Sequence, residues 1–529
     1  MSADDRAGAA GPASPAGPAG LDPLELAVWS SLVAMIAEEM GSVLVRGALS
    51  PNIRERRDAS CALFDAEGRM VAQAAHIPVH LGALPEAVRA VRAARPVAGD
   101  VFLLNSPWHG GSHLPDLTMV EAIDDGHGRV AGFAVVRAHH ADVGGMSPGS
   151  MPQGATELVQ EGLVLPPVRL ERAGVPDDEL LALVLANVRT PAERRGDLAA
   201  QRAACDVGAR GWRALLERHG AARIAAVTGG LLDYAERRAV ARLAALEGAR
   251  GRAEDALEGD GVSDAEVPLR VALAVSEGRL HLDFAGTAPM VRGNVNCPIQ
   301  VTRAAALFVL RSLLPDDVPT NEGIARPIVI ATPDDCCLAA RAPAAVAAGN
   351  VEMSQRITDL LFAAFADAGV PVPAQGQGTM NNITFGGAGW TFYETLGGGQ
   401  GASERGPGPD AVHVGMSNTR NTPIESLERA YPIVIERYAV RRGSGGAGRH
   451  RGGDGIVRAY RVLAPCTVTL LTERRGRAPR GAQGGGDGLP GENLLNGERL
   501  PAKCRRELVP GDVVEVRTPG GGGWGAPRD

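Results

Sequence analysis

The sequence predicts a mixed α+β protein with several domains. Its 529 residues correspond to roughly three domains at about 150 residues each. The middle of the chain is rich in Ala, Leu and Arg with few helix breakers, whereas the last third has short apolar runs between glycine clusters. Helical and strand-rich segments are thus partly segregated along the chain, as they are in α+β folds.

We expect five regions along the chain. The first 20 residues are mostly Ala, Gly, Pro and Ser, which cannot form a core. The expected regions are a flexible tail (1–20), an α/β region with the densest cluster of His and Asp (21–180), a helical segment (181–260), a mixed α/β region with binding loops (261–425) and a β-rich C-terminal region (426–529).

The first elements follow from local signals. Pro23 after Asp22 predicts a helix start, because proline fits the first helical position. Apolar residues then recur at a helical period to residue 43, with glutamates between them, which predicts an amphipathic helix and not a membrane span. Residues 60–73 predict a hairpin around the turn signal at 65–68. Short buried strands are expected at 101–104 and 130–136.

The later elements follow the same reasoning. Residues 184–250 predict two or three helices, and residues 266–284 predict a hairpin that turns near Gly278. The remaining expected elements are helices around 302–314 and 351–369 and strands at 433–440, 467–472 and 513–516.

Glycine is unusually frequent. The chain has 69 glycines, about twice the usual share. In an otherwise well-patterned chain this favours tight turns and surfaces lined by backbone, since glycine has no Cβ. The alternative is that the loops are simply short.

Composition excludes several classes of function. A net charge of −7 disfavours nucleic acid as a partner, because phosphate contacts need a basic face. Lys503 is the only lysine, so a phosphate-binding loop lysine or a Schiff-base lysine would have to be that residue. If ATP is used, another chain is therefore expected to bind it.

The seven cysteines include no C-x-x-C pair, which indicates neither a disulfide framework nor a zinc ribbon. The N-terminus has no signal-peptide pattern, and no run of eighteen apolar residues occurs. We therefore expect a cytoplasmic protein that does not insert into a membrane.

The densest cluster of reactive side chains lies between residues 105 and 142. It contains His113 and Asp116, with a proline between them that argues against a helix interior, and then His139, His140 and Asp142 at the end of an apolar strand. Because neighbouring strand residues point to opposite faces, only one of the two adjacent histidines can easily face His113.

Imidazoles and carboxylates gathered in this way suit a divalent metal such as Zn, Mn or Fe. Two other interpretations remain open at this point. The histidines could act as general bases oriented by Asp, without a metal, or all these groups could be satisfied polar residues of the core.

Further candidates lie outside this cluster. Asp58 stands among three arginines, where an ion pair or a ligand role is possible, and His76 and His80 lie in an apolar stretch that suits a pocket wall. Several later loops place amide side chains or arginine beside glycine or proline, which could bind an amide or carboxylate substrate or could simply form turns. The substrate-binding candidates are Asn294, Asn296, Asn381, Asn382 and Arg420.

Taken together, these motifs resemble the hydantoinase B/oxoprolinase family, over roughly residues 22–526. The segments that carry the resemblance are Glu55-Arg-Arg-Asp58, Ala75-His-Ile-Pro-Val-His80, Gly110-Gly-Ser-His113-Leu-Pro-Asp116, Arg137-Ala-His139-His140-Ala-Asp142, Gly293-Asn-Val-Asn-Cys-Pro298, Gly349-Asn-Val-Glu352, Gly378-Thr-Met-Asn-Asn382, Asn418-Thr-Arg-Asn-Thr-Pro423, Gly443-Ser-Gly-Gly-Ala-Gly448 and Thr518-Pro-Gly-Gly-Gly-Gly523.

The resemblance implies one divalent metal (Mn, Zn or Fe) held by Asp58, His113, Asp116 and His139, with His139 chosen over His140 as the first histidine after the strand. It also implies a larger hydantoinase A-like partner that binds ATP and Mg and phosphorylates a substrate oxygen. Asp142 or a nearby histidine such as His140 would then relay protons.

The expected function is therefore that of the B-type subunit of an ATP-dependent cyclic-amide hydrolase (hydantoinase, 5-oxoprolinase or lactamase). A metal-bound water would open a ring that the partner has activated by phosphorylation, within a hetero-oligomer. Two alternatives stay open: a subunit of an ATP-dependent ketone carboxylase of the acetone or acetophenone type, and a non-catalytic scaffold for the partner that binds ATP.

Overall fold

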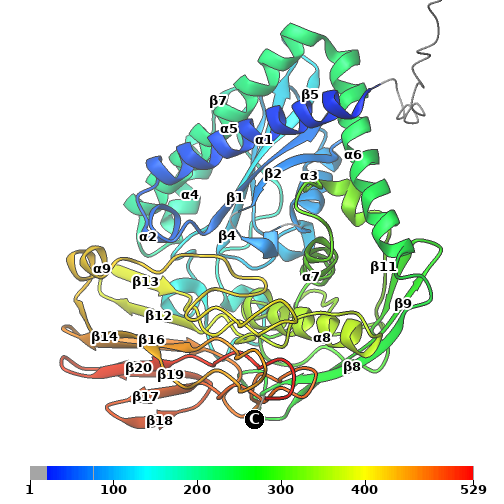
Figure 1. Cartoon of the computed structure of the whole chain (residues 1–529). Helices are drawn as coiled ribbons and strands as arrows, with labels where there is room; N and C mark the ends of the chain where they lie inside the picture. Colours follow the sequence, from blue (N-terminus) through cyan, green and yellow to red (C-terminus); the bar gives the residue numbers. More distant parts are fainter. Residues whose placement is uncertain (1–20, 76, 81, 528–529) are drawn as a thin grey trace, which may run out of the picture.

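The computed structural model describes residues 21–75, 77–80 and 82–527. An N-terminal sheet covered by long helices forms one body, and three further sheets and the helix α8 lie mostly below it in the view of Figure 1. Helices and several separate sheets coexist, which confirms the predicted α+β class. The expected tail and His76 lie outside the described residues.

The N-terminal body is built on a seven-stranded antiparallel sheet with the order β2-β1-β5-β4-β3-β6-β7. Helices α1 and α5 cover one face and α3 the other (Figure 1). The strands are β1 (Ala59–Asp65), β2 (Met70–Ala75), β3 (Val101–Leu104), β4 (Asp116–Asp124), β5 (Val130–His139), β6 (Val168–Arg172) and β7 (Val175–Pro176). The helices are α1 (Pro23–Gly47), α2 (Pro51–Arg54), α3 (Leu84–Ala93), α4 (Asp178–Ala186), α5 (Pro191–His219) and α6 (Ala221–Ala244).

Helix α1 begins where the sequence predicts. Asp22 caps it by accepting a hydrogen bond from the backbone N–H of Glu25 at 2.7 Å, and Pro23 occupies the first turn. Its buried face, which includes Trp29 and Met40, packs against α5 and the sheet. Among the described residues, α1 is the one helix whose length and apolar composition would suffice to cross a membrane.

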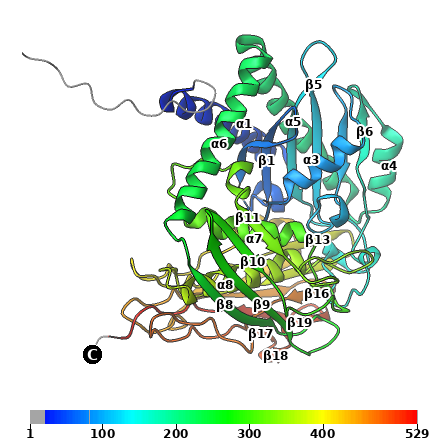
Figure 2. The same cartoon turned by 90° about the vertical axis from the view of Figure 1, so that its right-hand side faces the viewer.

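A second body follows below the first. Its sheet has the order β11-β10-β9-β8, with β10 and β11 parallel and the other pairs antiparallel, and α7 and α8 pack in its core. Figure 2 shows β8 and β9 beside α8 at the base of this body. Its elements are β8 (Arg250–Leu257), β9 (Val267–Ser276), β10 (Arg279–Asp283), α7 (Ile299–Ser312), β11 (Ile328–Ala331), the π-helical turn η7 (Gly349–Met353) and α8 (Ser354–Asp367).

The sequence predicts a helical segment that extends to residue 260, but the structure has the strand β8 at Arg250–Leu257. The helices end at Ala244, and β8 begins six residues later. Alternate side chains of its pairing partner β9 are buried, which is a strand pattern. In β8 itself the alternation is weak because Arg, Ala and Glu dominate it.

The C-terminal third holds two antiparallel sheets, β13-β12-β16-β19 and β14-β15-β20-β17-β18, around a shared apolar core. The predicted strands of this third appear as β14, β16 and β20. Its elements are β12 (Asn382–Gly387), β13 (Trp390–Glu394), α9 (Ile424–Ala430), β14 (Ile433–Arg441), β15 (Gly455–Val462), β16 (Cys466–Leu471), β17 (Glu492–Leu495), β18 (Glu498–Leu500), β19 (Lys503–Leu508) and β20 (Val513–Arg517).

Many glycines of this third bring backbones together outside the strands. Gly453 donates to the carbonyl of Gln400 at 2.8 Å, and Gly521 donates to the carbonyl of Gly453 at 2.9 Å. A Cβ on Gly453 would lie 1.9 Å from the carbonyl oxygen of Pro409. No larger residue fits such a contact, so these positions favour close backbone packing over short loops as the reason for the glycine content.

Candidate metal centre

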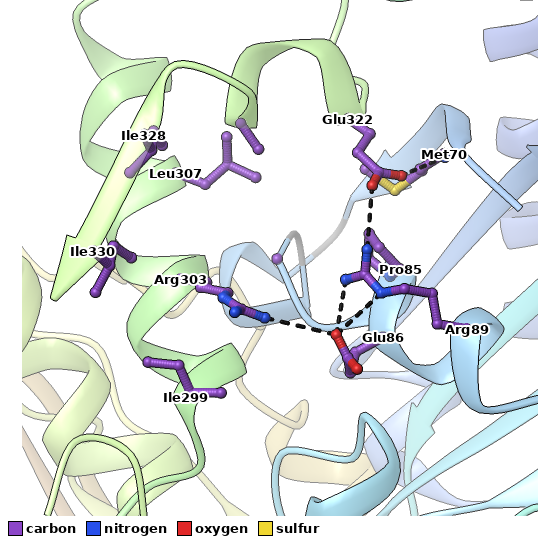
Figure 3. Close-up of a pocket in the computed structure, with 12 residues that line it drawn as sticks. Met70, Pro85, Glu86, Arg89, Ile299, Arg303, Leu307, Glu322, Ile328 and Ile330 are labelled. Carbon is purple, nitrogen blue, oxygen red and sulfur yellow. Dashed lines mark hydrogen bonds and ion pairs between the residues drawn. The ribbon is translucent and has the colours of Figure 1, made fainter. Parts of the chain in front are cut away.

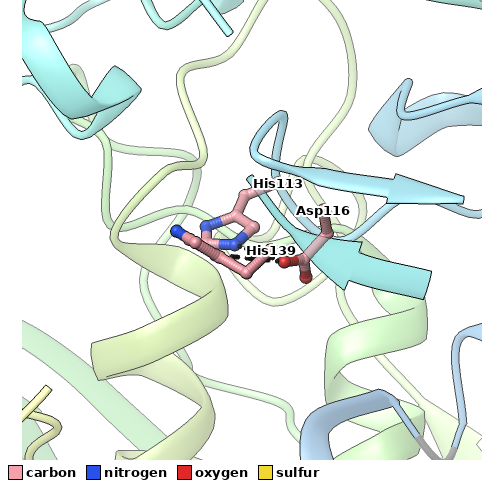
Figure 4. A group of neighbouring side chains, drawn as sticks. All are labelled: His113, Asp116 and His139. Carbon is pink, nitrogen blue, oxygen red and sulfur yellow. Dashed lines mark hydrogen bonds and ion pairs between the residues drawn. The ribbon is translucent and has the colours of Figure 1, made fainter. Parts of the chain in front are cut away.

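Strand register brings the central residues of the site together. Asp116 is the first residue of β4, His139 is the last residue of β5, and the two are direct partners in the antiparallel pair. His113 lies in the loop that leads into β4. All three side chains are buried and converge in Figure 4.

The geometry of the triad His113–Asp116–His139 fits a metal site. Oδ1 of Asp116 lies 3.1 Å from Nε2 of His113 and 3.2 Å from Nδ1 of His139. One ligand atom from each residue lies within 4.8 Å of the others. Two atoms that share a zinc at about 2.0–2.1 Å are about 3.3 Å apart in a tetrahedron, close to these separations.

Hydrogen bonds to the triad fix which atoms face inward. Nδ1 of His113 lies 3.2 Å from the carbonyl oxygen of Ala347; because a carbonyl only accepts, Nδ1 carries the proton. Nε2 of His113 therefore faces the Asp116 carboxylate. Nε2 of His113 and Nε2 of His139 have no hydrogen-bond partner among the described residues. Buried imidazole nitrogens and a carboxylate oxygen that converge in this way suit a shared cation, so the donor set fits a divalent metal.

The second carboxylate oxygen of Asp116 is held by neighbouring groups. Ser112 Oγ donates to Oδ2 at 2.6 Å, and Nε2 of His80 lies 3.3 Å from the same atom. Asn350 Nδ2 approaches it at 3.4 Å. These contacts leave Oδ1 for the two imidazoles, which is how outer groups orient a ligating carboxylate.

Electrostatics keep the carboxylate charged. Burial alone would raise the pKa of Asp116, but the imidazoles of His113, His139 and His80 outweigh burial and hold this pKa well below its usual value. Burial lowers the pKa of His139, against the hydrogen bond with Asp116 that raises it. The site therefore offers a charged carboxylate and, at His139, an imidazole whose neutral form is favoured, which are the forms that bind a metal.

An aromatic ring covers the triad from the C-terminal third. The ring of Tyr393, from β13, stacks on His139 with centroids 4.5 Å apart and planes at 18°. The guanidinium of Arg56 lies over the same ring at 5.0 Å and donates to the Tyr393 carbonyl. Sequence reasoning missed Tyr393, because nothing in its local pattern separates it from a core aromatic residue.

Asp58 lies beside the triad but is not part of it. Its carbonyl accepts from the backbone N–H of His139 at 3.0 Å, and its carboxylate pairs with Arg56 at 3.5 Å. The group of potential ligands in the described structure contains only the other three predicted residues. A ligand role for Asp58 stays a prediction.

The two predicted proton relays are placed elsewhere. His140 points to the opposite face from His139, and its Nε2 lies 2.9 Å from Oε1 of Gln201. Burial, followed by the charge of Arg194, lowers its pKa to about 4. Asp142 accepts from the backbone N–H groups of Gly144 and Gly149 and forms an ion pair with Arg189 at 2.9 Å. Their catalytic roles stay predictions, and the structure does not join them to the triad.

The predicted substrate-binding amides hold backbone and one another. Asn296 donates to three carbonyls, those of Val291, Gly293 and Ala345, which is the turn chemistry left open above. Asn294 donates to the carbonyl of Pro152, and its Oδ1 is buried without a hydrogen-bond partner among the described residues.

The other three candidates differ in their distance from the triad. Asn382 contacts Tyr393, whose hydroxyl donates to Oδ1 at 2.8 Å, and so lies next to the site. Asn381 bonds to Gln377 and Arg475, and the Arg420 side chain is exposed. Substrate binding by these residues stays a prediction.

A cavity of about 550 Å³ lies between α3, α7 and β11 (Figure 3). Apolar side chains from α7 and β11 line part of its wall. The charged groups are Glu86 and Arg89 of α3, which pair with each other, and Arg303 of α7, which approaches the Glu86 carboxylate. Gly82 lines it, two residues after His80, whose imidazole contacts Asp116.

Comparisons with known proteins cover almost the whole chain. The family model described as hydantoinase B/oxoprolinase matches residues 22–527. The 5-oxoprolinase 1 of Arabidopsis thaliana is 37% identical over 535 residues, which are 96% of this chain but only 42% of that protein. The putative B-type subunit of a D-/L-hydantoinase from a Pseudomonas species is 30% identical over 542 residues, with 96% and 91% covered.

The fold is also found in a solved structure. The ATP-dependent caprolactamase of Pseudomonas jessenii superposes with a TM-score of 0.86 at 27% identity, covering 96% of this chain and 91% of the other.

Proposed function

Because the chain belongs to the hydantoinase B/oxoprolinase family, we propose that it is the B-type subunit of an ATP-dependent enzyme that hydrolyses cyclic amides. One observation carries this proposal. The chain spans nearly the whole of the Pseudomonas hydantoinase relative but about two-fifths of a 5-oxoprolinase. It therefore corresponds to one part of the longer relatives, which supports the proposal of a second, ATP-binding partner.

The lysine content supports the proposal that the partner, and not this chain, binds ATP. The only lysine, Lys503, is buried in an ion pair with Glu473, so it is not free to bind a nucleotide phosphate. In the proposed reaction the partner phosphorylates the carbonyl oxygen of the cyclic amide. This converts a resonance-stabilised amide into an activated imidate.

Within this chain, His113, Asp116 and His139 would hold one divalent metal. Such a metal supplies a water of lowered pKa and polarises the substrate. The chain's own groups orient the ligands: Ala347 fixes the His113 tautomer, Ser112 and His80 hold the outer oxygen of Asp116, and Tyr393 covers His139. Burial of all three ligands excludes bulk water, which strengthens these interactions.

The test is reconstitution with the ATP-binding partner. Hydantoin, 5-oxoproline and caprolactam are offered with ATP, in the presence and absence of bicarbonate, to the wild type and to His113→Ala. Ring opening without bicarbonate that is lost in His113→Ala supports the proposal. Bicarbonate-dependent carboxylation of acetone instead would make the chain part of a carboxylase. Undiminished turnover in both His113→Ala and His139→Ala would leave it a scaffold.

A further inference from the structure

A buried carboxyl group lies three contacts away from the candidate metal centre. Glu352 belongs to the π-helical turn η7, a rare geometry that is frequently found at functional sites. The same turn carries Asn350, which approaches Asp116. Neither the triad nor the expected ligand set includes Glu352.

A continuous series of contacts joins this carboxyl group to His139. Oε1 of Glu352 accepts from Nδ2 of Asn382 at 2.7 Å, and Oδ1 of Asn382 accepts from the Tyr393 hydroxyl at 2.8 Å. The Tyr393 ring then stacks on the imidazole of His139. Every one of these side chains is buried.

The amide in this series is locked in one orientation. Asn382 donates its second N–H to the carbonyl of Leu471 at 2.8 Å. A flipped amide would point its oxygen at both the Glu352 carboxyl and that carbonyl, which is repulsive. Tyr393 must therefore donate to Asn382, and its hydroxyl is linked to Glu352 through an amide that Glu352 and Leu471 hold together.

Glu352 stands apart from the ion-pair cluster beside it. The neighbouring Glu473 forms ion pairs with Arg356, at 3.0 Å, and with Lys503. Among the described residues Glu352 forms no ion pair. Its Oε1 also accepts from the backbone N–H of Met380 at 3.1 Å, whereas its Oε2 has no hydrogen-bond partner. Burial, and then the charge of Glu473, raise the pKa of Glu352 to about 7. Burying a carboxyl group without an ion pair costs stability, and buried carboxyl groups with a raised pKa are found preferentially at functional sites.

We propose that Glu352 is a positioning residue of the metal centre, which sets the orientation of the His139 imidazole through Asn382 and the ring of Tyr393. The inference rests on the metal-dependent function proposed above. It extends that function to a residue outside the triad, which reaches His139 only through Asn382 and Tyr393. Groups that orient a ligating histidine from outside typically change metal affinity by 10–100-fold when removed.

The test measures metal binding rather than turnover. The full chain is stripped of metal and titrated with Zn²⁺ against a competing chelator, and with Co²⁺, whose visible absorption reports ligand orientation. We expect Glu352→Ala to weaken Zn²⁺ binding about 10-fold and to shift the Co²⁺ bands. Glu352→Gln keeps an oxygen that accepts from Asn382, so it should stay within about 2-fold of the wild type.

A double-mutant cycle shows whether the effect passes through the tyrosine. Tyr393→Phe keeps the ring over His139 but removes the hydroxyl link, so it should reproduce the effect of Glu352→Ala. The double variant should then be no weaker than either single variant, because both break the same series of contacts. Glu473→Gln is the matched control: it removes a buried carboxylate of the neighbouring cluster and should leave Zn²⁺ affinity and the Co²⁺ spectrum unchanged.

The outcomes separate this inference from the proposed function. If the wild type binds neither Zn²⁺ nor Co²⁺ at the triad, the metal-dependent function fails. If the wild type binds but Glu352→Ala matches it, or if the two single effects multiply in the double variant, only the role of Glu352 is overturned. Should Glu352→Ala not fold, unchanged affinity and spectrum in Tyr393→Phe overturn it equally.

Discussion

The adjacent histidines at the end of β5 give the sharpest test of the metal centre. His139 and His140 are both buried, are neighbours in sequence and have the same side chain. The strand sends one to Asp116 and the other to Gln201. Replacing each in turn by alanine therefore removes the same atoms from opposite faces of one strand.

The two replacements should affect different properties: His139→Ala should lower metal binding, and His140→Ala should lower stability. His139→Ala removes one of the three proposed ligands, and we expect bound metal to fall from about one ion per chain to a small fraction. His140→Ala leaves the acceptor oxygen of Gln201 unpaired in the core, which costs about 1–3 kcal/mol of unfolding free energy. Its metal content should stay at the wild-type level.

Elemental mass spectrometry after loading with Zn²⁺ or Mn²⁺ measures the first quantity, and urea unfolding measures the second. The reasoning is refuted if His140→Ala loses the metal while His139→Ala keeps it. It is also refuted if neither replacement changes the metal content of a wild type that binds one ion.

Three further predictions concern the surroundings of the site. Folding lowers the pKa of His140 from 6.5 to about 4, so the unfolded chain binds more protons than the folded chain between pH 6.5 and pH 4. The free energy of unfolding should therefore drop as the pH falls from 6.5 to 4, and urea unfolding of His140→Gln should show a shallower drop. Asp142→Asn should lose about 1–3 kcal/mol of stability, because its oxygens accept from backbone N–H groups and Arg189, while metal loss in this variant would make Asp142 part of the site. Gly453→Ala should destabilise the C-terminal third by about 1–3 kcal/mol or more, whereas Gly406→Ala, with open space at its Cβ, should stay within about 0.5 kcal/mol; equal effects in thermal unfolding would contradict the backbone-packing explanation.

The elements with strong local signals could be predicted from the sequence. The start of α1, the hairpin of β1 and β2, and the strand β3 follow from a cap, a turn signal and an apolar run. Strand β4 could not be predicted in this way. It is buried along almost its whole length, so no alternation marks it, and the proline before Asp116 hides its start.

In the candidate site, too, local patterns could be predicted from the sequence and long-range contacts could not. Alternation alone indicates that one of His139 and His140 faces His113, and the resemblance singles out His139. The contacts that orient the triad come from residues more than 230 positions away, such as Ala347 and Asn350. No spacing in the sequence reports such contacts, because they depend on how η7 packs against β4.

The triad therefore depends on all three parts of the chain, although its own residues come from one. His113, Asp116 and His139 belong to the N-terminal body, Ala347 and Asn350 to the second, and Tyr393 to the C-terminal third. Burial alone disfavours the charged carboxylate of Asp116, so the groups that stabilise it must be held in place. The glycines that let the C-terminal backbones pack closely thus also support the candidate site, since the third that they stabilise carries the aromatic ring over His139.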